Sequence, residues 1–195
     1  MFTTGSSSGF AHLTNVDLSG QFIVFDVSAL AGQIQTFGMM VILNQIWSLV
    51  RANRDTGLRT WLYVDEFHRF FHNEYSIRTF LDIYKRARKY GLGVTGITQN
   101  IDELLGNDQA RLMLSNADFL LLMNQKTTDA EMLQDLLELS DEQVRLMTTA
   151  QAGCGLLNTN GVSLGFNNRM NQRNLLAKLY STRFGDGLPQ AGGVL

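Results

Sequence analysis

The sequence lacks most of the features that mark secreted or membrane-spanning proteins. It holds one cysteine, Cys154, and one proline among 195 residues. A lone cysteine excludes an internal disulfide and a thiolate metal cluster, and it is typical of a reducing compartment such as the cytosol. The longest apolar stretch, residues 37–50, is interrupted by polar residues and is shorter than the roughly 18 residues of a membrane helix. We therefore expect a cytoplasmic protein that reaches a membrane only through partners.

The chain also lacks an excess of either charge. The formal net charge is -2 at pH 7, and charged residues make up 17% of the sequence against 45% for hydrophobic residues. This balance is typical of a folded α/β protein and gives no overall attraction to nucleic acid. The length suits about one domain. We expect that domain at residues 21–180, between a polar loop or hairpin at 1–20 and a flexible tail at 181–195.

Short apolar runs alternate with amphipathic segments along the chain. Buried strands are predicted at 22–27, 60–64, 93–98 and 118–123, and helices at 28–50, 76–90 and 129–139. This alternation favours an α/β fold with a mostly parallel sheet and helices on both faces. Asn160-Gly161 separates two further apolar runs and predicts the turn of a terminal β-hairpin.

Two carboxylates close the second of these strands, in Trp61-Leu62-Tyr63-Val64-Asp65-Glu66. Parallel α/β sheets bind ligands outside the carboxyl ends of their strands, which is where Asp65 and Glu66 fall. Nucleoside triphosphate hydrolysis needs one carboxylate that holds a water of the Mg²⁺ shell and another that orients the attacking water. An apolar run followed by Asp-Glu also arises by chance, so this motif needs support from a second feature.

Gln99 supplies that second feature. It follows the next strand, in Ile97-Thr98-Gln99, at the sheet edge where Asp65 and Glu66 are expected. A glutamine there can sense the γ-phosphate or position the lytic water. Taken alone, it is equally compatible with a helix-capping or loop residue. Only its combination with the two carboxylates favours a nucleotide site.

Four cations lie within residues 85–89, at the end of the helix predicted between these strands. Their commoner role is to complement the helix dipole while they stay solvated. The alternative is that Arg86 or Arg88 reaches the nucleotide of a neighbouring subunit as an arginine finger.

His68 and His72 follow the acidic pair at a spacing of four. This spacing also occurs in zinc sites, but the His-Glu-x-x-His pattern is absent. We expect no direct metal ligation and place both histidines on the segment just after the acidic strand. Of the neighbouring aromatics Phe67, Phe70 and Phe71, at least two are expected in the core.

Several segments together resemble the ATPases of conjugative type IV secretion systems. They are Phe25-Asp26-Val27, the acidic strand end, Arg86-Ala87-Arg88-Lys89-Tyr90-Gly91, Thr98-Gln99-Asn100-Ile101-Asp102-Glu103-Leu104-Leu105 and Gly153-Cys154-Gly155-Leu156-Leu157, in the order seen in that family. The likeness spans roughly residues 10–180. These ATPases belong to a larger group of hexameric DNA-pumping and secretion motors.

The resemblance implies a RecA-like fold and a set of site residues. Asp65 and Glu66 would be the Walker B pair, with Asp65 on Mg²⁺ through a water, and Gln99 would be the sensor. Arg86 or Arg88 would be the intersubunit arginine. Members of the family commonly form homo-hexamers and hydrolyse ATP with Mg²⁺. They power pilus biogenesis or substrate transfer at the cytoplasmic face of the inner membrane, beside secretion-channel proteins.

One departure from the family pattern matters. No Gly-x-x-x-x-Gly-Lys-Ser/Thr sequence, the Walker A loop, occurs in the chain, and no lysine follows a glycine. This loop cradles the β- and γ-phosphates, and in the family it lies upstream of the matched segment. We therefore expect a C-terminal part of the ATPase domain, incomplete at its N-terminal side, that has no appreciable ATPase activity alone.

Two other functions stay open. A non-hydrolysing interaction subunit of the secretion machinery would keep the RecA-like surface without the phosphate loop. A DNA-translocating coupling ATPase would need basic loops that face DNA, and basic residues here cluster mostly at 85–89. A longer reading frame with Gly-Lys-Ser/Thr would favour the motor, and salt-dependent DNA binding would favour the coupling ATPase.

Overall fold

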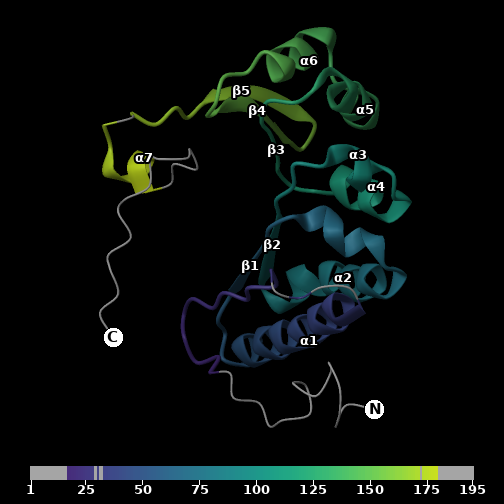
Figure 1. The fold of residues 1–195 in the computed structure, drawn as a ribbon, viewed down its shortest axis with the longest axis vertical. Helices are drawn as coiled ribbons and strands as arrows, with labels where there is room; N and C mark the ends of the chain where they lie inside the picture. Colours follow the sequence, from purple (N-terminus) through teal and green to yellow (C-terminus); the bar gives the residue numbers. More distant parts are fainter. Residues whose placement is uncertain (1–16, 29, 31–32, 172, 180–195) are drawn as a thin grey trace. The chain divides into compact units, whose positions relative to one another are not determined.

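A computed structural model describes residues 17–28, 30, 33–171 and 173–179. The chain divides into two compact units, Met1–Leu104 and Leu105–Leu195. The elements up to the boundary are α1 (Gln33–Asp55), β1 (Thr60–Val64), the 3-10 helix η2 (Phe67–His72), α2 (Glu74–Ala87), the 3-10 helix η3 (Arg88–Tyr90), β2 (Leu92–Gly96) and α3 (Ile101–Leu105) (Figure 1). The later elements are α4 (Asp108–Ser115), β3 (Leu120–Leu122), α5 (Thr127–Leu137), α6 (Asp141–Thr148), β4 (Cys154–Thr159), β5 (Val162–Asn167) and α7 (Leu175–Leu179).

The first unit is built on a parallel pair of strands. β1 pairs with β2 along its whole length, from Thr60 opposite Leu92 to Val64 opposite Gly96. The chain crosses from one strand to the other through α2, as a parallel pair requires. β1 has the bounds that its sequence predicts, whereas β2 runs from Leu92 to Gly96 and ends before residue 98. The predicted parallel pairing is confirmed.

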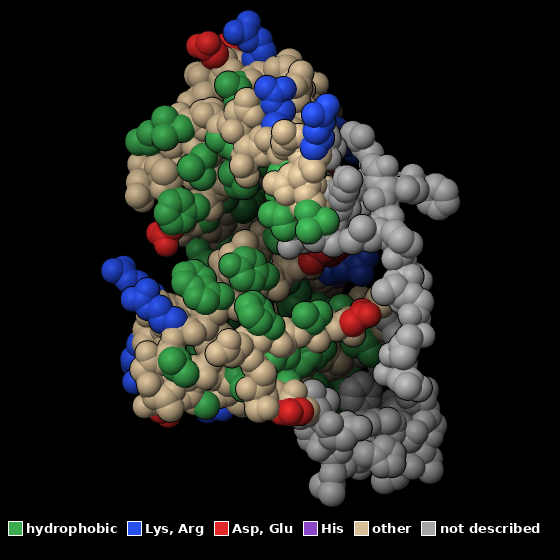
Figure 2. All heavy atoms as spheres, turned by 90° about the vertical axis from the view of Figure 1, so that its left-hand side faces the viewer, with side chains coloured by type: hydrophobic (Ala, Val, Ile, Leu, Met, Phe, Trp, Pro, Cys, Tyr) green, Lys and Arg blue, Asp and Glu red, His purple; other side chains and the backbone are tan. Residues whose placement is uncertain are grey.

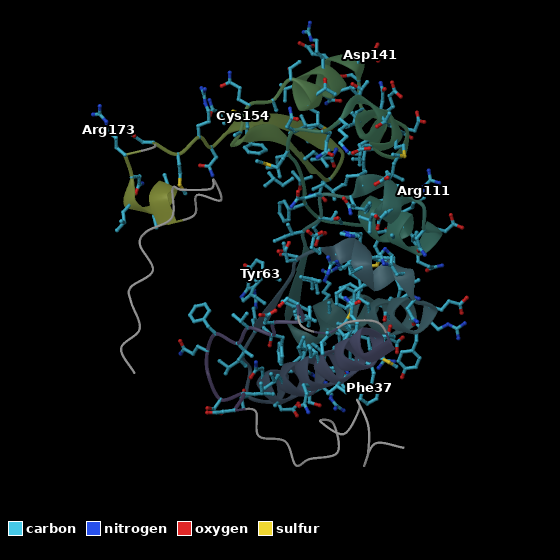
Figure 3. All side chains as sticks on the ribbon, in the orientation of Figure 1. Phe37, Tyr63, Arg111, Asp141, Cys154 and Arg173 are labelled. Atoms are coloured by element: carbon cyan, nitrogen blue, oxygen red, sulfur yellow. The ribbon has the colours of Figure 1, made fainter. Side chains whose placement is uncertain are left out.

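The two faces of β1 differ because burial alternates along the strand. Val64 is buried on one face, whereas Trp61 and Tyr63 are 65% and 67% exposed on the other. α2 contacts β2, and α1 lies beside α2 (Figure 1). Tyr63, labelled in Figure 3, marks the open face. The described helices of this unit thus cover one face of the pair and leave an aromatic face open.

Both ends of α2 follow from local chemistry. The Asn73 side chain accepts hydrogen bonds from the backbone N–H groups of Tyr75 at 2.9 Å and Ser76 at 3.4 Å, which caps the helix start. Gly91 follows η3 with a φ of 65°. A glycine adopts this left-handed conformation without a steric penalty, so Gly91 can end the helical segment.

The predicted strand at 22–27 is wrong. These residues form no strand in the structure, and Phe22 and Val24 are 95% and 89% exposed. The segment ends in a local turn, in which Asp26 accepts a hydrogen bond from the Ser28 backbone N–H at 2.8 Å. The side chain and backbone of Ser28 lower the pKa of the Asp26 carboxyl. A β-rich run prefers an extended chain, but it becomes a strand only where it pairs with a neighbour.

The second unit is built on an antiparallel sheet with the strand order β3-β4-β5. The predicted strand at 118–123 contains β3, which pairs antiparallel with β4. The predicted terminal hairpin is confirmed, since Thr159 pairs with Val162. Between them, Asn160 and Gly161 have φ values of 49° and 76°, as a type I′ turn requires.

Among the described residues, no helix combines the length and the apolar character needed to cross a membrane. The expected N-terminal loop lies outside the described residues up to residue 16, and the expected tail at 181–195 lies wholly outside them.

Candidate functional site

The carboxyl ends of β1 and β2 meet at one edge of the parallel pair. Just beyond the strands, the backbone N–H of Ile97 donates to the carbonyl of Val64, and that of Phe67 donates to the carbonyl of Ile97, each at 2.8 Å. The chain segments that leave the two strands are therefore joined. The structure brings residues 65–66 and 98–99 to the same edge, as predicted.

Glu66 has an uncommon backbone conformation. Its φ of 49° and ψ of 47° are left-handed, which costs roughly 1–2 kcal/mol for a residue with a Cβ atom. Its backbone N–H donates to the carboxylate of Asp65 at 2.9 Å. Such strain persists only where the surroundings impose it, and it concentrates at functional sites. Here it turns the chain sharply after β1 and leaves the Glu66 side chain 37% exposed.

Phe67 holds this turn against the core. Its ring is 9% exposed, and its centroid lies 5.1 Å from those of Phe71 and Phe80. A Cβ atom at Gly96 would come within 2.8 Å of the ring, so β2 ends in a glycine where the ring needs space. Phe67 and Phe71 are both buried, which confirms the expectation for two of the three aromatics.

His68 is buried beside the acidic pair, with an exposed fraction of 4%. Its Nδ1 lies 2.9 Å from Thr98 Oγ1 and 3.4 Å from Glu66 Oε2. Its Nε2 lies 3.2 Å from Asn100 Nδ2 and 3.8 Å from Glu103 Oε2. One imidazole thus contacts both the turn after β1 and the segment after β2.

His72 lies on the same 3-10 helix but is exposed. Its Nε2 is 2.9 Å from Glu103 Oε2, and its ring centroid is 5.9 Å from that of His68. Both histidines therefore lie immediately after the acidic strand, where the sequence places them. Within the described ranges, no group of three or more His, Cys, Asp and Glu side chains is arranged to hold a metal ion.

Asp65, Glu66 and Gln99 form an accessible set of oxygen and amide groups at the sheet edge. Asp65 and Gln99 are exposed. Carboxylate oxygens suit Mg²⁺, which keeps several of its waters when it binds to proteins. These side chains therefore fit the acidic half of a magnesium–nucleotide site. The chain has no Gly-Lys-Ser/Thr loop that would bind the phosphates.

Arg86 and Arg88 lie at the other end of β2. They precede Leu92, where the strand begins, whereas Gln99 follows its far end. The 5 residues of β2 separate these ends by roughly 16 Å at about 3.3 Å per residue. The structure brings neither arginine to the acidic pair of its own chain, so an arginine-finger role would need a site on another molecule.

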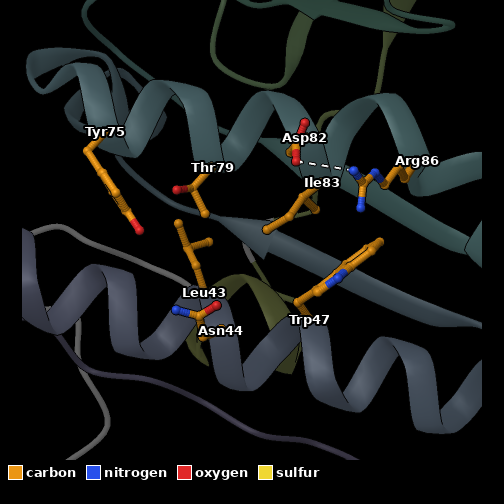
Figure 4. A pocket seen from close by; sticks show the side chains of 8 residues that line it. All are labelled: Leu43, Asn44, Trp47, Tyr75, Thr79, Asp82, Ile83 and Arg86. Atoms are coloured by element: carbon orange, nitrogen blue, oxygen red, sulfur yellow. Dashed lines mark ion pairs between the residues drawn. The ribbon is translucent and has the colours of Figure 1, made fainter.

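Arg86 also lines a pocket of about 220 Å³ between α1 and α2 (Figure 4). Its guanidinium lies 3.4 Å from the Asp82 carboxylate in an exposed pair, which is worth roughly 0.3–0.5 kcal/mol. The other lining residues are Leu43, Asn44, Trp47, Tyr75, Thr79 and Ile83. Arg88 is exposed and does not line this pocket.

Sequence reasoning placed His68 correctly but missed its contacts. Thr98 lies 30 residues later in the chain, and no local pattern links the two. The sequence held one signal for the burial of His68. Its spacing of three from Phe71 puts both side chains on one side of a 3-10 helix.

Comparison with known proteins agrees with this geometry. The model of the TraG P-loop domain family matches residues 10–159. Among solved structures, VirB4 of Thermoanaerobacter pseudethanolicus is similar at 27% identity with a TM-score of 0.73, over 86% of this chain and 46% of that one. The chain thus spans less than half of that relative's length, and no curated protein matches it. The resemblance to conjugative type IV secretion ATPases is confirmed, and the chain belongs to the TraG P-loop domain family.

Proposed function

We propose that this chain supplies the acidic and sensor half of the ATP site in a motor of a conjugative type IV secretion system. The observation that carries the proposal is the shared sheet edge of Asp65, Glu66 and Gln99, where parallel α/β sheets bind their ligands. Membership of the TraG P-loop family supports it. ATP hydrolysis would power pilus biogenesis or substrate transfer.

Each of the three side chains has its own role in this proposal. Asp65 holds a water of the Mg²⁺ shell through its exposed carboxylate. When bound, Mg²⁺ neutralises charge on the phosphates. Glu66 orients and polarises the attacking water, and its constrained backbone limits the directions that its carboxylate can take. Gln99 contacts the γ-phosphate or the same water.

The proposal includes assembly with copies of the chain in a hexamer and with secretion-channel proteins at the cytoplasmic face of the membrane. Arg86 and Arg88 both lie at the end of β2 remote from the acidic pair, and Arg88 would contact a neighbour's nucleotide because Arg86 already pairs with Asp82 and lines the pocket. Trp61 and Tyr63 are exposed on one face of β1, and exposed hydrophobic side chains are visible at the surface in Figure 2. Exposed apolar surface of this kind favours contact with a partner.

A non-hydrolysing interaction subunit is the second candidate function. The lack of a phosphate loop in the sequence and the open aromatic face of β1 favour it. In that case, the carboxylates of Asp65 and Glu66 would take no part in ATP turnover.

ATP turnover by a longer form of the protein that includes a phosphate loop tests the proposal. We expect Glu66→Gln to lower kcat by about 10²- to 10⁴-fold, because the attacking water loses its base. The matched control is Glu74→Gln on α2, where the side chain is 88% exposed and no change is expected. Equal turnover in Glu66→Gln and wild type would overturn the proposal.

A further inference from the structure

We propose that His68 is a positioning residue, which fixes where the Glu66 carboxylate lies relative to Thr98 and Asn100 in the polar segment after β2. Its catalytic meaning rests on the proposed ATP site. Its structural basis is the set of contacts that the imidazole makes with Glu66, Thr98 and Asn100.

The burial of His68 fixes the orientation of its ring. Only His68, Ser76 and Asp129 are buried polar or charged side chains among the described residues. A buried polar ring is costly unless its nitrogens are hydrogen-bonded. Both nitrogens of His68 have neighbours within hydrogen-bonding distance, so a rotated ring would lose them.

These neighbours assign the proton of the neutral ring to Nδ1. With the Asn100 amide oriented so that Nδ2 faces Nε2 at 3.2 Å, Nε2 is the acceptor. Nδ1 then carries the proton, and its N–H donates a hydrogen bond to Thr98 Oγ1 at 2.9 Å. Glu66 Oε2, at 3.4 Å from Nδ1, lies on the same side of the ring.

Thr98 links His68 to the turn that carries Gln99. Its Oγ1 also accepts the backbone N–H of Asn100 at 3.1 Å. Gln99 lies between these two residues, so the hydroxyl that His68 contacts also holds the turn that carries Gln99. A displacement of His68 would therefore disturb Glu66 and Gln99 together.

The constrained backbone of Glu66 is a second reason to expect a support of this kind. Its left-handed conformation persists only where neighbouring groups impose it. Phe67 supports the turn through its buried ring and its backbone bond to Ile97. The Nδ1 of His68 lies 3.4 Å from the carboxylate itself, whereas a phenylalanine ring has no polar group to place there.

The first test uses NMR on this chain without nucleotide. His68→Phe fills the buried space but removes both nitrogens, whereas His68→Asn keeps a donor near the position of Nδ1. We expect His68→Phe to shift the side-chain carboxyl resonance of Glu66 and the amide resonances of Gln99 and Asn100. His68→Asn should leave them near their wild-type positions. Unchanged resonances in His68→Phe would overturn the inference.

Two further variants keep this test decisive. His72→Phe is the matched control, because His72 lies on the same helix but is exposed, and we expect it to leave the Glu66 resonance in place. Thr98→Val removes the Oγ1 atom at nearly constant volume and replaces His68→Phe if that variant does not fold. A Glu66 resonance that stays unshifted in Thr98→Val counts against the inference in the same way.

The second test measures ATP turnover by the longer form of the protein. We expect His68→Phe to lower kcat by about 10- to 100-fold, as loss of an orienting partner does, with KM for ATP changed by less than about threefold. His68→Asn should restore most of the loss. A loss confined to KM, or one equal in both variants, would indicate a merely structural role and overturn the inference. Absent turnover in the wild type would refute the proposed function, while the NMR comparison would still decide the role of His68.

Discussion

The backbone nitrogen of Phe67 lies 2.8 Å from the carbonyl oxygen of Ile97, to which it donates a hydrogen bond. This bond lies beyond Val64 and Gly96, the last residues that β1 and β2 pair. It keeps the chain around Asp65 and Glu66 next to the chain around Gln99 after the strands have ended. The proposed site therefore depends on the packing around Phe67 as well as on its polar residues.

Replacement of Gly96 by alanine tests this packing. A Cβ atom there would lie 2.8 Å from the Phe67 ring, so we expect Gly96→Ala to lower the free energy of unfolding by about 1–3 kcal/mol, as overpacking does. Urea denaturation measures the change. Gly20→Ala is the control, because its nearest neighbour is 3.4 Å away, and it should stay within about 0.5 kcal/mol of wild type. Equal stability of the two variants would contradict the close packing of the Phe67 ring against Gly96.

The contrast between the two faces of the first unit gives a second prediction. Phe80 is 0% exposed, so Phe80→Ala should lower the free energy of unfolding by about 3–5 kcal/mol. Trp61 is 65% exposed, and Trp61→Ser should cost less than about 1 kcal/mol. Urea denaturation of Phe80→Ala and Trp61→Ser measures both changes in the free energy of unfolding. A loss for Trp61→Ser as large as that for Phe80→Ala would show that the aromatic face is covered.

Much of the fold could be predicted because its signals are local. β1 is a short apolar run closed by polar residues, and the hairpin of β4 and β5 turns at Asn160-Gly161, where both residues need a positive φ. The choice of strand partner is not local. Residues 22–27 have a strand-like sequence but no pairing, and β3 pairs antiparallel with β4 rather than in a parallel sheet.

In the candidate site, too, some features could be predicted from the sequence and others depend on tertiary contacts. Asp65, Glu66 and Gln99 could be placed together because the carboxyl ends of adjacent parallel strands share one edge. The left-handed backbone of Glu66 could not be predicted, since glutamate rarely adopts it. The bond between His68 and Thr98 depends on tertiary packing across 30 residues, for which a single sequence holds no pattern.

The start of α6 gives a third prediction. Ser140 Oγ accepts the backbone N–H of Gln143 at 3.4 Å, and Gln143 Oε1 accepts that of Ser140 at 2.8 Å, so the two side chains form a capping box. Ser140→Ala should cost about 0.5–2 kcal/mol of stability. Ser48→Ala, at an exposed position within α1, should be neutral or stabilising because alanine favours helices. Thermal unfolding that ranks the two variants the other way would contradict the capping box.

The two arginines give a fourth prediction. In the longer form of the protein, Arg88→Ala should lower ATP turnover by about 10³-fold or more if it acts as an intersubunit finger. Arg86→Ala should have a smaller effect, since Arg86 pairs with Asp82 beside α1. Steady-state turnover at saturating ATP measures both. A larger loss in Arg86→Ala would reverse the assignment.

Calorimetric titration of ATP with Mg²⁺ tests the central claim most directly, with this chain and with the longer form that includes a phosphate loop. We predict Mg²⁺-dependent binding by the longer form, weakened by Asp65→Asn, and no binding by this chain alone, because the loop holds the β- and γ-phosphates. Absence of binding by both forms would contradict the account and favour a non-hydrolysing interaction subunit.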